Sequence, residues 1–406
     1  MSSASTNSYR IIRRTSLSNC VPGAVIIGGD YQGLGIVRSL GRKGIPVCVI
    51  DDEHSISRYS RYTSIAVSVP NLRDAEQTRD ALLRIGHSLD LKGWVLFPTR
   101  DELVATISNH RDALRDIFRV PTPHWDAIQW IWDKRNTYKL AQKLGIPIPQ
   151  TWFPESAEDL AGIDAHFPLV LKPAIKEHFI YATKAKAWRA TNPNELSERF
   201  QAATRITGRG EMLVQELIPG DGQNQFAYCA FFKQGRAVGS MVACRRRQHP
   251  YEFGRASTFV ETRELPILEK LSERFLQAIN YYGLVEVEYK RDPRDGQFKM
   301  LDVNARTWGY HTLGNAAGVD FPYLIYRDQL GDDVETCRGK AGVSWIRLLT
   351  DLPAATVALT LGRLRLADYL QTLRHFDTEA VFTQDDLLPG VMECFLLPYL
   401  AAKKGF

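Results

Sequence analysis

Short apolar runs alternate with helical stretches over the first third of the chain. Residues 24–27 and 47–50 have the unbroken apolar pattern of strands buried on both faces, and the segment between them is helical up to Gly44. A third apolar run, residues 94–97, precedes a helical stretch from about residue 101 to 115. The pattern therefore predicts a doubly wound domain with a parallel sheet over residues 21–125.

Two later runs alternate polar and apolar positions with the period of a strand. Their polar faces carry Glu286, Glu288 and Lys290 on the first strand, and Asp302, Asn304 and Arg306 on the second. The connection between them contains Pro293 and Gly296, residues that favour a tight turn. If the two polar faces coincide, oxygen ligands suited to Mg²⁺ gather beside an arginine suited to an anion.

The region before this hairpin contains strands with polar residues at their ends. One strand ends at Lys172, and another, over residues 212–218, runs through Gln215 and Glu216 into a Pro-Gly turn. Further strands are expected over residues 226–232 and 237–243, and an amphipathic helix over 265–283. Residues 174–190 hold three lysines with little periodicity, which is typical of a mobile loop that covers an anion.

The two ends of the chain have a different character. Residues 1–20 contain six serines and three arginines but no acidic residue, so we expect a disordered leader, with an organellar transit peptide as the alternative. From about residue 340, leucine-rich helical pieces predict an extension that packs on the main domain or on a partner subunit.

Composition sets the broad class. The 406 residues are 44% apolar and 24% charged, with a formal net charge of +5, and no apolar run has the length of a membrane span. These values indicate a protein of two or three domains that binds neither membrane nor nucleic acid through a dense basic patch. The six cysteines lack metal-site spacing and indicate reduced thiols in a cytoplasmic protein; Cys244, beside three arginines, is interpreted as a small buried side chain rather than a nucleophile.

The ordered set of lysines, hinge strand, arginine cluster and hairpin resembles the ATP-grasp superfamily. The resemblance covers residues 21–330 and is greatest for the predicted carboxylate–amine ligases, which share the Arg247-Gln-His-Pro250-Tyr-Glu-Phe-Gly254 stretch. It implies an α/β protein: an N-terminal domain over 21–125, a two-lobed ATP-grasp domain with antiparallel sheets over 126–335, and a helical extension over 336–406. The small lobe spans about residues 150–220.

The resemblance assigns roles to residues at the nucleotide. Lys134 and Lys172 would contact the α- and β-phosphates, Gln215 the exocyclic amine of adenine, and the backbone of Glu216 and Ile218 the ring edge. Gln223 or Asn224 would bind the ribose. Many relatives have glycines in the phosphate loop, whereas this chain has Ala174-Ile-Lys-Glu-His-Phe179, so lysines and His178 would bind there instead.

The resemblance also assigns the metal ligands and the catalytic arginines. Glu288, Asp302 and Asn304 match the ligands of Mg²⁺, for which Mn²⁺ is the alternative. Asp302 stands where relatives have Glu. Arg245, Arg247 and Arg306 would face the γ-phosphate and an acyl phosphate, because residues two apart share one face of a strand; Arg246 would point away and form a salt bridge.

The implied reaction transfers a phosphoryl group from ATP to a carboxylate, which an amine then attacks, with release of ADP and phosphate. Both substrates would be small and amino-acid-like, and the protein could form a homodimer. His311 and His249 are candidate bases. The acceptor pocket is expected to be lined by Trp308, Tyr310, His311 and Asn315.

Three alternatives remain open. An ATP-grasp carboxylase or thiol ligase would use the same site with another acceptor. A non-catalytic ATP-binding protein would be expected to lack the metal ligands or arginines, which this chain has. A nicotinamide-dependent oxidoreductase would use the glycines from Gly28 to Gly35 and the acid Asp51, but it leaves the hairpin unexplained.

Overall fold

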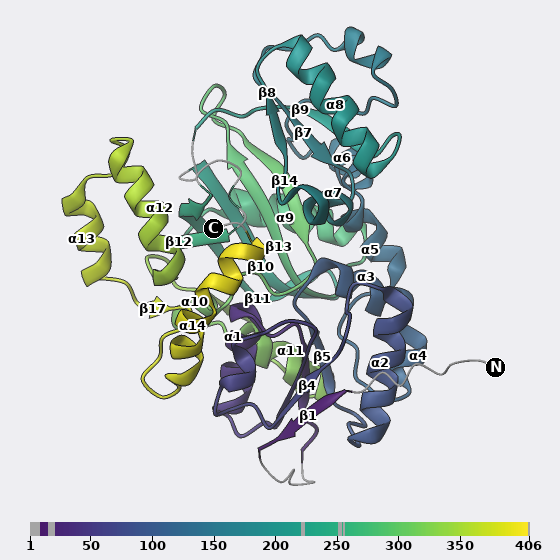
Figure 1. The fold of residues 1–406 in the computed structure, drawn as a ribbon, viewed down its shortest axis with the longest axis vertical. Coiled ribbons are helices and arrows are strands. Elements are labelled where there is room, and N and C mark those ends of the chain that lie inside the picture. The colour runs from purple at the N-terminus through teal and green to yellow at the C-terminus, as the bar shows by residue number, and fades with distance from the viewer. Residues whose placement is uncertain (1–8, 15–20, 221–223, 251–253, 255, 405–406) are drawn as a thin grey trace.

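The protein consists of three sheets stacked along its long axis. The computed structural model describes residues 9–14, 21–220, 224–250, 254 and 256–404. Figure 1 shows a small lobe at the top, a central sheet in the middle and an N-terminal domain at the bottom. Within the described residues, no helix is long and apolar enough to cross a membrane.

The N-terminal domain is built on a five-stranded sheet ordered β1-β4-β3-β2-β5. Its strands are β1 (Arg10–Arg13), β2 (Ala24–Ile27), β3 (Val47–Asp51), β4 (Ile65–Ser68) and β5 (Val95–Pro98). Its helical elements are α1 (Tyr31–Gly41), η1 (Ser57–Tyr59), α2 (Ala75–Ser88), α3 (Asp101–Asn109) and α4 (Arg111–Arg115). Strands β2 to β5 are parallel; α1 packs on one face, whereas α2 and α3 pack on the other. The doubly wound fold is thus confirmed.

Part of the expected leader belongs to this sheet. Residues Arg10–Arg13 form β1, which pairs antiparallel with β4, from Arg10 opposite Ser68 to Arg13 opposite Ile65. The expectation of disorder is therefore wrong for these four residues, because the backbone of β4 provides hydrogen-bond partners that the sequence does not reveal. Residues 1–8 and 15–20 lie outside the described part of the chain.

The small lobe is a four-stranded antiparallel sheet ordered β6-β9-β7-β8. Its strands are β6 (Thr151–Trp152), β7 (Leu169–Pro173), β8 (Trp188–Ala190) and β9 (Met212–Glu216). The helical elements of this region are α5 (Trp125–Trp132) and α6 (Lys134–Lys143), which precede the lobe, and η2 (Glu158–Gly162), α7 (Lys176–Thr183) and α8 (Pro193–Thr207).

Helix α7 replaces the mobile loop expected over residues 174–190. Phe179 on this helix is fully buried, and its ring packs edge-on against Trp188 of β8 with 4.8 Å between the centroids. This aromatic contact stabilises α7, whose helical pattern of apolar residues is difficult to recognise in the sequence because of the lysines in and around it. The expectation of a loop is wrong here.

The central sheet has eight strands, seven of them in the order β14-β13-β10-β11-β12-β16-β17 and the eighth, β15, paired with β11. They are β10 (Gln225–Lys233), β11 (Arg236–His249), β12 (Ala256–Arg263), β13 (Gly283–Arg291), β14 (Phe298–Asn304), β15 (Cys337–Arg338), β16 (Ser344–Ile346) and β17 (Thr378–Glu379). One face packs against α5, α6 and α9 (Pro266–Ala278).

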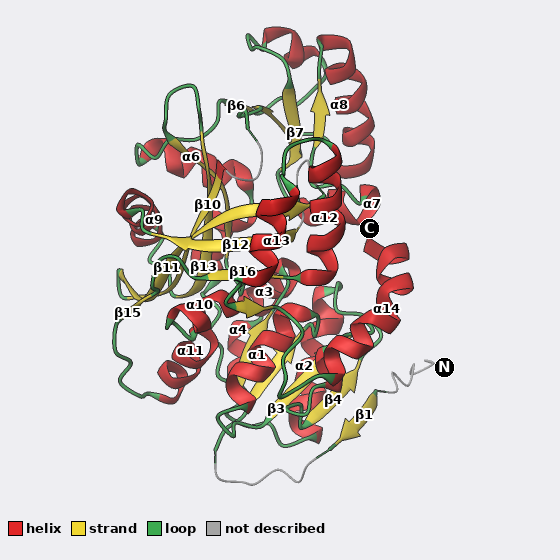
Figure 2. Ribbon diagram, turned by 90° about the vertical axis from the view of Figure 1, so that its left-hand side faces the viewer, coloured by secondary structure: helices red, strands yellow, loops and turns green. Residues whose placement is uncertain are grey.

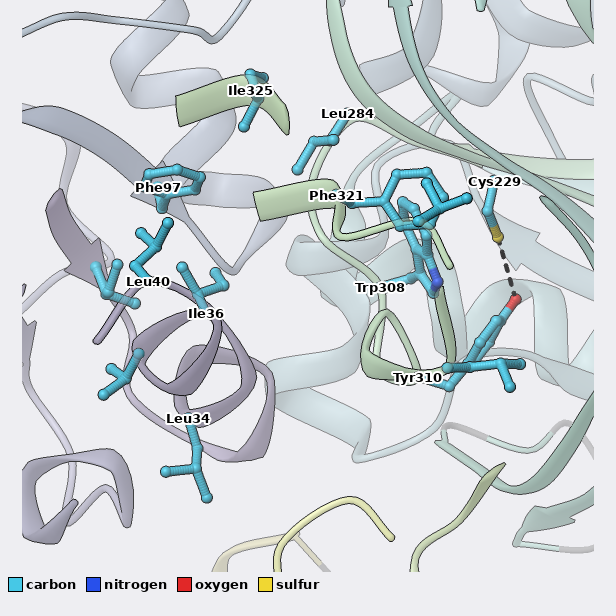
Figure 3. Close-up of a cluster of buried hydrophobic side chains, with 14 of the residues drawn as sticks. Leu34, Ile36, Leu40, Phe97, Cys229, Leu284, Trp308, Tyr310, Phe321 and Ile325 are labelled. Carbon is cyan, nitrogen blue, oxygen red and sulfur yellow. Dashed lines mark hydrogen bonds between the residues drawn. The ribbon is translucent and has the colours of Figure 1, made fainter. Parts of the chain in front are cut away.

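The opposite face of the central sheet packs against the N-terminal domain. Helices α10 (Thr312–Ala317) and α11 (Phe321–Leu330) lie between them. Figure 3 shows Leu34 and Leu40 of α1 in the same buried cluster as Trp308, Phe321 and other side chains of the central domain. A continuous apolar core therefore joins the two domains, with α1 of the N-terminal domain packed on the side of the central domain.

The C-terminal extension comprises α12 (Leu348–Thr360), α13 (Leu366–Arg374) and α14 (Leu388–Lys404). Helix α12 packs on β11 and β12, and α14 packs on η1 of the N-terminal domain (Figure 2). The extension is not purely helical as expected, since its short strands β16 and β17 extend the central sheet beyond β12.

Candidate active site

The hairpin of β13 and β14 brings the expected metal ligands onto one face. Glu288 lies opposite Asp302, and Glu286 lies opposite Asn304. The turn closes where Gly296 adopts a φ of 75° and donates its N–H to the Asp292 carbonyl at 2.8 Å. The hypothesis that the two polar faces coincide is confirmed.

Asn304 is held in one orientation by its neighbours. Its amide nitrogen donates to Oε2 of Glu286 at 3.0 Å and to Oε1 of Glu288 at 3.2 Å. Its oxygen consequently faces cations, with Nζ of Lys176 at 3.5 Å and Nη2 of Arg306 at 3.4 Å. An amide oxygen fixed in this way is suited to a hard metal ion.

Glu286 helps to hold the Asn304 side chain in this orientation. The hydroxyl of Tyr310 donates to its Oε1 at 2.5 Å, and the residue is only 3% exposed. Burial and the adjacent Glu288 raise the pKa of Glu286 to about 7. Glu286 thus orients Asn304 rather than standing as an equal member of the ligand set.

Each of the three expected ligands presents an oxygen to a cation. Asp302 forms an ion pair with Lys134, and Glu288 lies 3.6 Å from Arg245. Burial would raise the pKa of Asp302, but Lys134 and the neighbouring lysines hold it below its usual range. Among the described residues, no group of three or more His, Cys, Asp or Glu side chains has a metal-binding arrangement. The candidate set is instead two carboxylates and one amide, whose oxygens already face positive charge and so fit Mg²⁺.

Lysines from two elements surround this oxygen set. Lys134 begins α6, where Asp133 caps the helix, and its backbone N–H donates to the Ala174 carbonyl at 3.0 Å. Lys172, at the end of β7, acts electrostatically on Asp302 and lowers its pKa. Both lysines therefore lie on the side of the hairpin that faces the small lobe.

Two of the three lysines that were expected to cover an anion reach the site. Lys176 begins α7 and contacts Asn304, as described above. Lys186 donates to the Gly254 carbonyl at 3.2 Å, and burial lowers its pKa to about 8 despite the nearby Glu288. Sequence inspection noted Lys176 as part of a loop, but only the three-dimensional position of α7 shows that it reaches the hairpin.

A pocket lies between the small lobe, the hairpin and the N-terminal domain. Its polar lining consists of Asp101, Lys134, Lys176, Glu177 and Asp302. Apolar residues from α3, α5 and β14 complete its walls. The combination of cations and carboxylates suits a metal-bound polyphosphate.

Arg245 and Arg306 reach the hairpin face as predicted. Arg245 donates to Gln225 at 2.9 Å and lies beside Glu288, which more than offsets the lowering of the arginine's pKa by burial. Arg306 donates from Nε to Oδ2 of Asp101 at 3.0 Å. Asp101 belongs to the N-terminal domain and was not predicted as a site residue.

Arg247 does not share this face, contrary to prediction. Arg245 pairs with Val260 and Arg247 with the next residue of β12, Phe259, so Arg246 is an extra residue in a bulge. The bulge turns Arg247 to the other face of the sheet, where it forms a two-bond ion pair with Asp351 at 2.8 and 2.9 Å. Arg246 lies 3.7 Å from Glu261, which confirms its expected salt bridge.

The hinge strand is partly occupied by internal contacts. The Gln215 side-chain nitrogen donates to Thr151 at 2.8 Å, and the Glu216 N–H donates to the Gln150 carbonyl at 2.9 Å. Lys290 donates to the Ile218 carbonyl at 2.8 Å. These contacts engage the Glu216 N–H and the Ile218 carbonyl, and binding of the adenine ring edge by backbone groups of Glu216 and Ile218 stays a prediction.

The ribose candidates lie at the end of this hinge. A Cβ added to Gly220 would meet the Asn224 side-chain nitrogen at 2.3 Å, so glycine permits the close approach of Asn224. Gln223 lies outside the described residues.

The expected acceptor residues have different environments. Trp308 is fully buried against Phe321, with ring centroids 4.8 Å apart, and is therefore a core residue. His311 is also buried, and its Nε2 lies 2.9 Å from the Gln32 carbonyl. Burial lowers the pKa of His311. Asn315 is exposed, whereas the Tyr310 hydroxyl contacts Glu286 of the hairpin.

Side chains of the N-terminal domain itself bind the backbone of its glycine turn and the acidic residues beside it. The Gly29 N–H donates to Asp51 at 2.6 Å, and Arg100 forms ion pairs with Asp51 at 2.6 Å and Asp52 at 2.8 Å. In a dinucleotide site the acid after the second strand binds a ribose hydroxyl. Here Arg100 binds that acid, which argues against the oxidoreductase alternative. Burial also raises the pKa of the Cys244 thiol, which argues against a cysteine nucleophile.

Comparison with known proteins agrees with this geometry. No family model matches the chain. A curated D-aspartate ligase from Enterococcus faecium (strain Aus0004) is 22% identical over 347 residues, which cover 81% of this chain and 82% of the relative.

Solved structures share the fold at low identity. An L-amino acid ligase from Bacillus licheniformis has a TM-score of 0.60 at 17% identity and covers 77% of this chain and 75% of its own. The biotin carboxylase domain of 2-oxoglutarate carboxylase from Hydrogenobacter thermophilus, a dimer in complex with MgADP, ADP and bicarbonate, has a TM-score of 0.62 at 15% identity and covers 79% and 73%. N5-carboxyaminoimidazole synthetase from Staphylococcus aureus, complexed with ADP, has a TM-score of 0.59 at 14% identity and covers 78% and 79%.

The chain therefore has the fold that these solved structures share. Two of these similar proteins, the D-aspartate ligase and the L-amino acid ligase, join amino acids.

Proposed function

We propose that the protein is an ATP-dependent carboxylate–amine ligase that acts through an acyl phosphate and releases ADP and phosphate. The observation that carries the proposal is the hairpin, where Glu288, Asp302 and Asn304 present oxygens within a ring of lysines and arginines. Two amino acid ligases among the relatives support the same assignment.

The roles of the residues follow from their positions. Lys134 and Lys172 bind the phosphates of ATP, and the three hairpin oxygens hold Mg²⁺ or Mn²⁺, which supplies charge neutralisation at the phosphates. Arg245 and Arg306 stabilise negative charge on the transferring phosphoryl group. Arg247 is not included, since it faces Asp351.

The reaction balances without a covalent enzyme intermediate. An oxygen of the substrate carboxylate attacks the γ-phosphorus, and ADP leaves. The amine nitrogen then attacks the acyl carbon, inorganic phosphate leaves with the bonding electrons, and the ammonium loses a proton. His311 is not supported as the base, because it is buried and its Nε2 lies 2.9 Å from the Gln32 carbonyl of α1.

The test is phosphate release from ATP in the presence of pairs of amino acids, including D- and L-aspartate, with each single substrate as control. We expect ADP and phosphate in equal amounts, and release that depends on both a carboxylate and an amine. Formation of AMP and pyrophosphate would overturn the acyl phosphate mechanism. Turnover with bicarbonate in place of the amino acid carboxylate would identify a carboxylase instead.

We also propose that the chain forms a homodimer through its C-terminal extension. Apolar side chains on α12, α13 and α14 are exposed, among them Leu352 at 60%, Leu366 at 60% and Phe395 at 75%. Light scattering during size-exclusion chromatography should give twice the chain mass, and a monomer at micromolar concentration would contradict this.

A further inference from the structure

Asp101 stands where three parts of the protein meet. It is the first residue of α3, which follows β5 of the N-terminal domain after Thr99 and Arg100. Its Oδ2 accepts a hydrogen bond from Nε of Arg306, which follows β14, at 3.0 Å. The same oxygen forms an ion pair with Lys176, the first residue of α7 in the small lobe. One carboxylate therefore binds cations from both lobes of the ATP-grasp domain.

The next residue of α3 also holds α7. The Tyr181 hydroxyl donates to Oε1 of Glu102 at 2.6 Å. The guanidinium of Arg73 lies 4.2 Å from the centroid of the Tyr181 ring. Helix α7 is thus docked on the N-terminal domain at two successive turns, through Lys176 and Tyr181.

Only one of these two contacts involves a proposed catalytic group. The Glu102 side chain accepts from Tyr181 of α7, whereas the Asp101 side chain contacts both α7 and Arg306. Lys176 and Arg306 both lie within 3.5 Å of the Asn304 oxygen. Asp101 is therefore the group that balances two cations that would otherwise compete with a metal ion for that oxygen.

We propose that Asp101 is a positioning residue that couples docking of α7 to the orientation of Arg306, and that it keeps both cations from blocking the metal site. The proposal rests on the proposed ligase function for its catalytic consequence. Its structural consequence, docking of α7, does not depend on that function.

The ion pair between Asp101 and Arg306 is largely buried, which strengthens the positioning role of Asp101. Arg306 and Asp101 are 15% and 17% exposed at their side chains, so the pair has little competition from water. Removing one member of such a buried pair leaves the other without compensation. In Asp101→Asn, Arg306 and Lys176 are left with the hairpin oxygens as their remaining partners in the site, and we expect them to move toward these.

The experiment compares Asp101→Asn with Glu102→Gln as a matched control. Trypsin cleavage after Lys184, an exposed residue at the end of α7, reports undocking of the helix. Electron paramagnetic resonance measures Mn²⁺ affinity in the presence of ADP, and steady-state assays give kcat and KM.

Both variants should be cleaved faster than wild type. Asp101→Asn should also bind Mn²⁺ about 10-fold more weakly and lose about 100-fold in kcat, as expected for a misplaced catalytic group. Glu102→Gln should stay within about 2-fold of wild type in both, since it only weakens a hydrogen bond, from a charged to a neutral acceptor, that lies away from the reacting atoms. Asp101→Glu, which keeps the charge, should restore part of the Mn²⁺ affinity and should be used if Asp101→Asn does not fold.

Unchanged cleavage and unchanged Mn²⁺ affinity in Asp101→Asn would overturn the proposal. Equal losses of kcat in both variants would also overturn it, because docking alone would then account for the effect. If wild type forms no amide with any substrate pair, the proposed function fails, yet cleavage and Mn²⁺ binding still decide the role of Asp101.

Discussion

Arg245 and Arg247 lie two residues apart on β11 and project from opposite faces of the central sheet. Arg245 lies beside Glu288 at the hairpin, whereas Arg247 binds Asp351 of α12. The bulge at Arg246 separates a residue of the proposed site from one that attaches the C-terminal extension. Substitutions at the two positions should therefore have different effects.

Arg247→Ala should destabilise the protein by about 3 kcal/mol, because it leaves the fully buried Asp351 carboxylate without its partner. The guanidinium also packs over the rings of Phe259 and Tyr369, so packing is lost as well. Urea unfolding measures the change. Arg246→Ala is the control, since its half-exposed contact with Glu261 should contribute less than about 1 kcal/mol. Equal stabilities of the two variants would contradict the role of Arg247.

Arg245→Ala should lower kcat/KM by about 100-fold, as does removal of a group that stabilises developing charge. The expected loss is in kcat, because the transferring phosphoryl group gains charge in the transition state. Initial rates of phosphate release over a range of ATP concentrations measure it. If Arg245→Ala changed only the KM for ATP, Arg245 would stabilise bound ATP and the transition state equally well.

Asp302→Ala and Asn304→Ala should each abolish turnover while leaving the fold intact. Asp302 now forms an ion pair with Lys134, so its loss frees the lysine but removes a metal oxygen. Removal of divalent cations with EDTA should have the same effect on the wild type, and Mg²⁺ should restore activity. Circular dichroism checks the fold. Activity retained in both variants would remove the metal assignment.

Glu177 gives the stability a specific pH dependence. Burial raises the pKa of its carboxyl from 4.5 to about 7, so the folded state holds the proton more tightly than the unfolded chain does. The stability that this group contributes is complete below its unfolded pKa and is lost as the pH rises through about 7.

Glu177→Gln should therefore gain melting temperature relative to wild type as the pH rises from about 4.5 to 8, by roughly 2–4 °C. Differential scanning fluorimetry across this range measures the difference. Asp126→Asn, at a carboxylate that is 84% exposed, should show no such trend. If the difference in melting temperature between Glu177→Gln and wild type did not change with pH, this would contradict the raised pKa of Glu177.

The sequence was most informative where side-chain period and turn chemistry agreed. The faces of the hairpin follow from strict alternation in two strands joined by a turn that contains Gly296, and the structure pairs Glu288 with Asp302 as expected. The buried strands β2 and β3 were recognisable because both faces of a parallel sheet are covered, which leaves no polar position in the run.

The failures have equally specific causes. Alternation assigned Arg247 to the wrong face, because a one-residue bulge reverses every later position and leaves no mark in composition. Asp101 was overlooked because its partners, Lys176 and Arg306, are 75 and 205 residues away in the chain, and only tertiary packing brings them together. The strand at Arg10–Arg13 was missed because its arginine ends do not indicate a strand, and it is pairing with β4 that stabilises it.

The two short strands β16 and β17 affect how the protein is made. They extend the central sheet beyond β12, although eighty residues separate β12 from β16 in the chain. During synthesis on the ribosome, all strands of the N-terminal domain and of the small lobe emerge well before the last strands of the central sheet. Until Ser344–Ile346 has emerged, the edge of β12 exposes unpaired backbone groups. That interval of synthesis is when the nascent chain has most to gain from a chaperone.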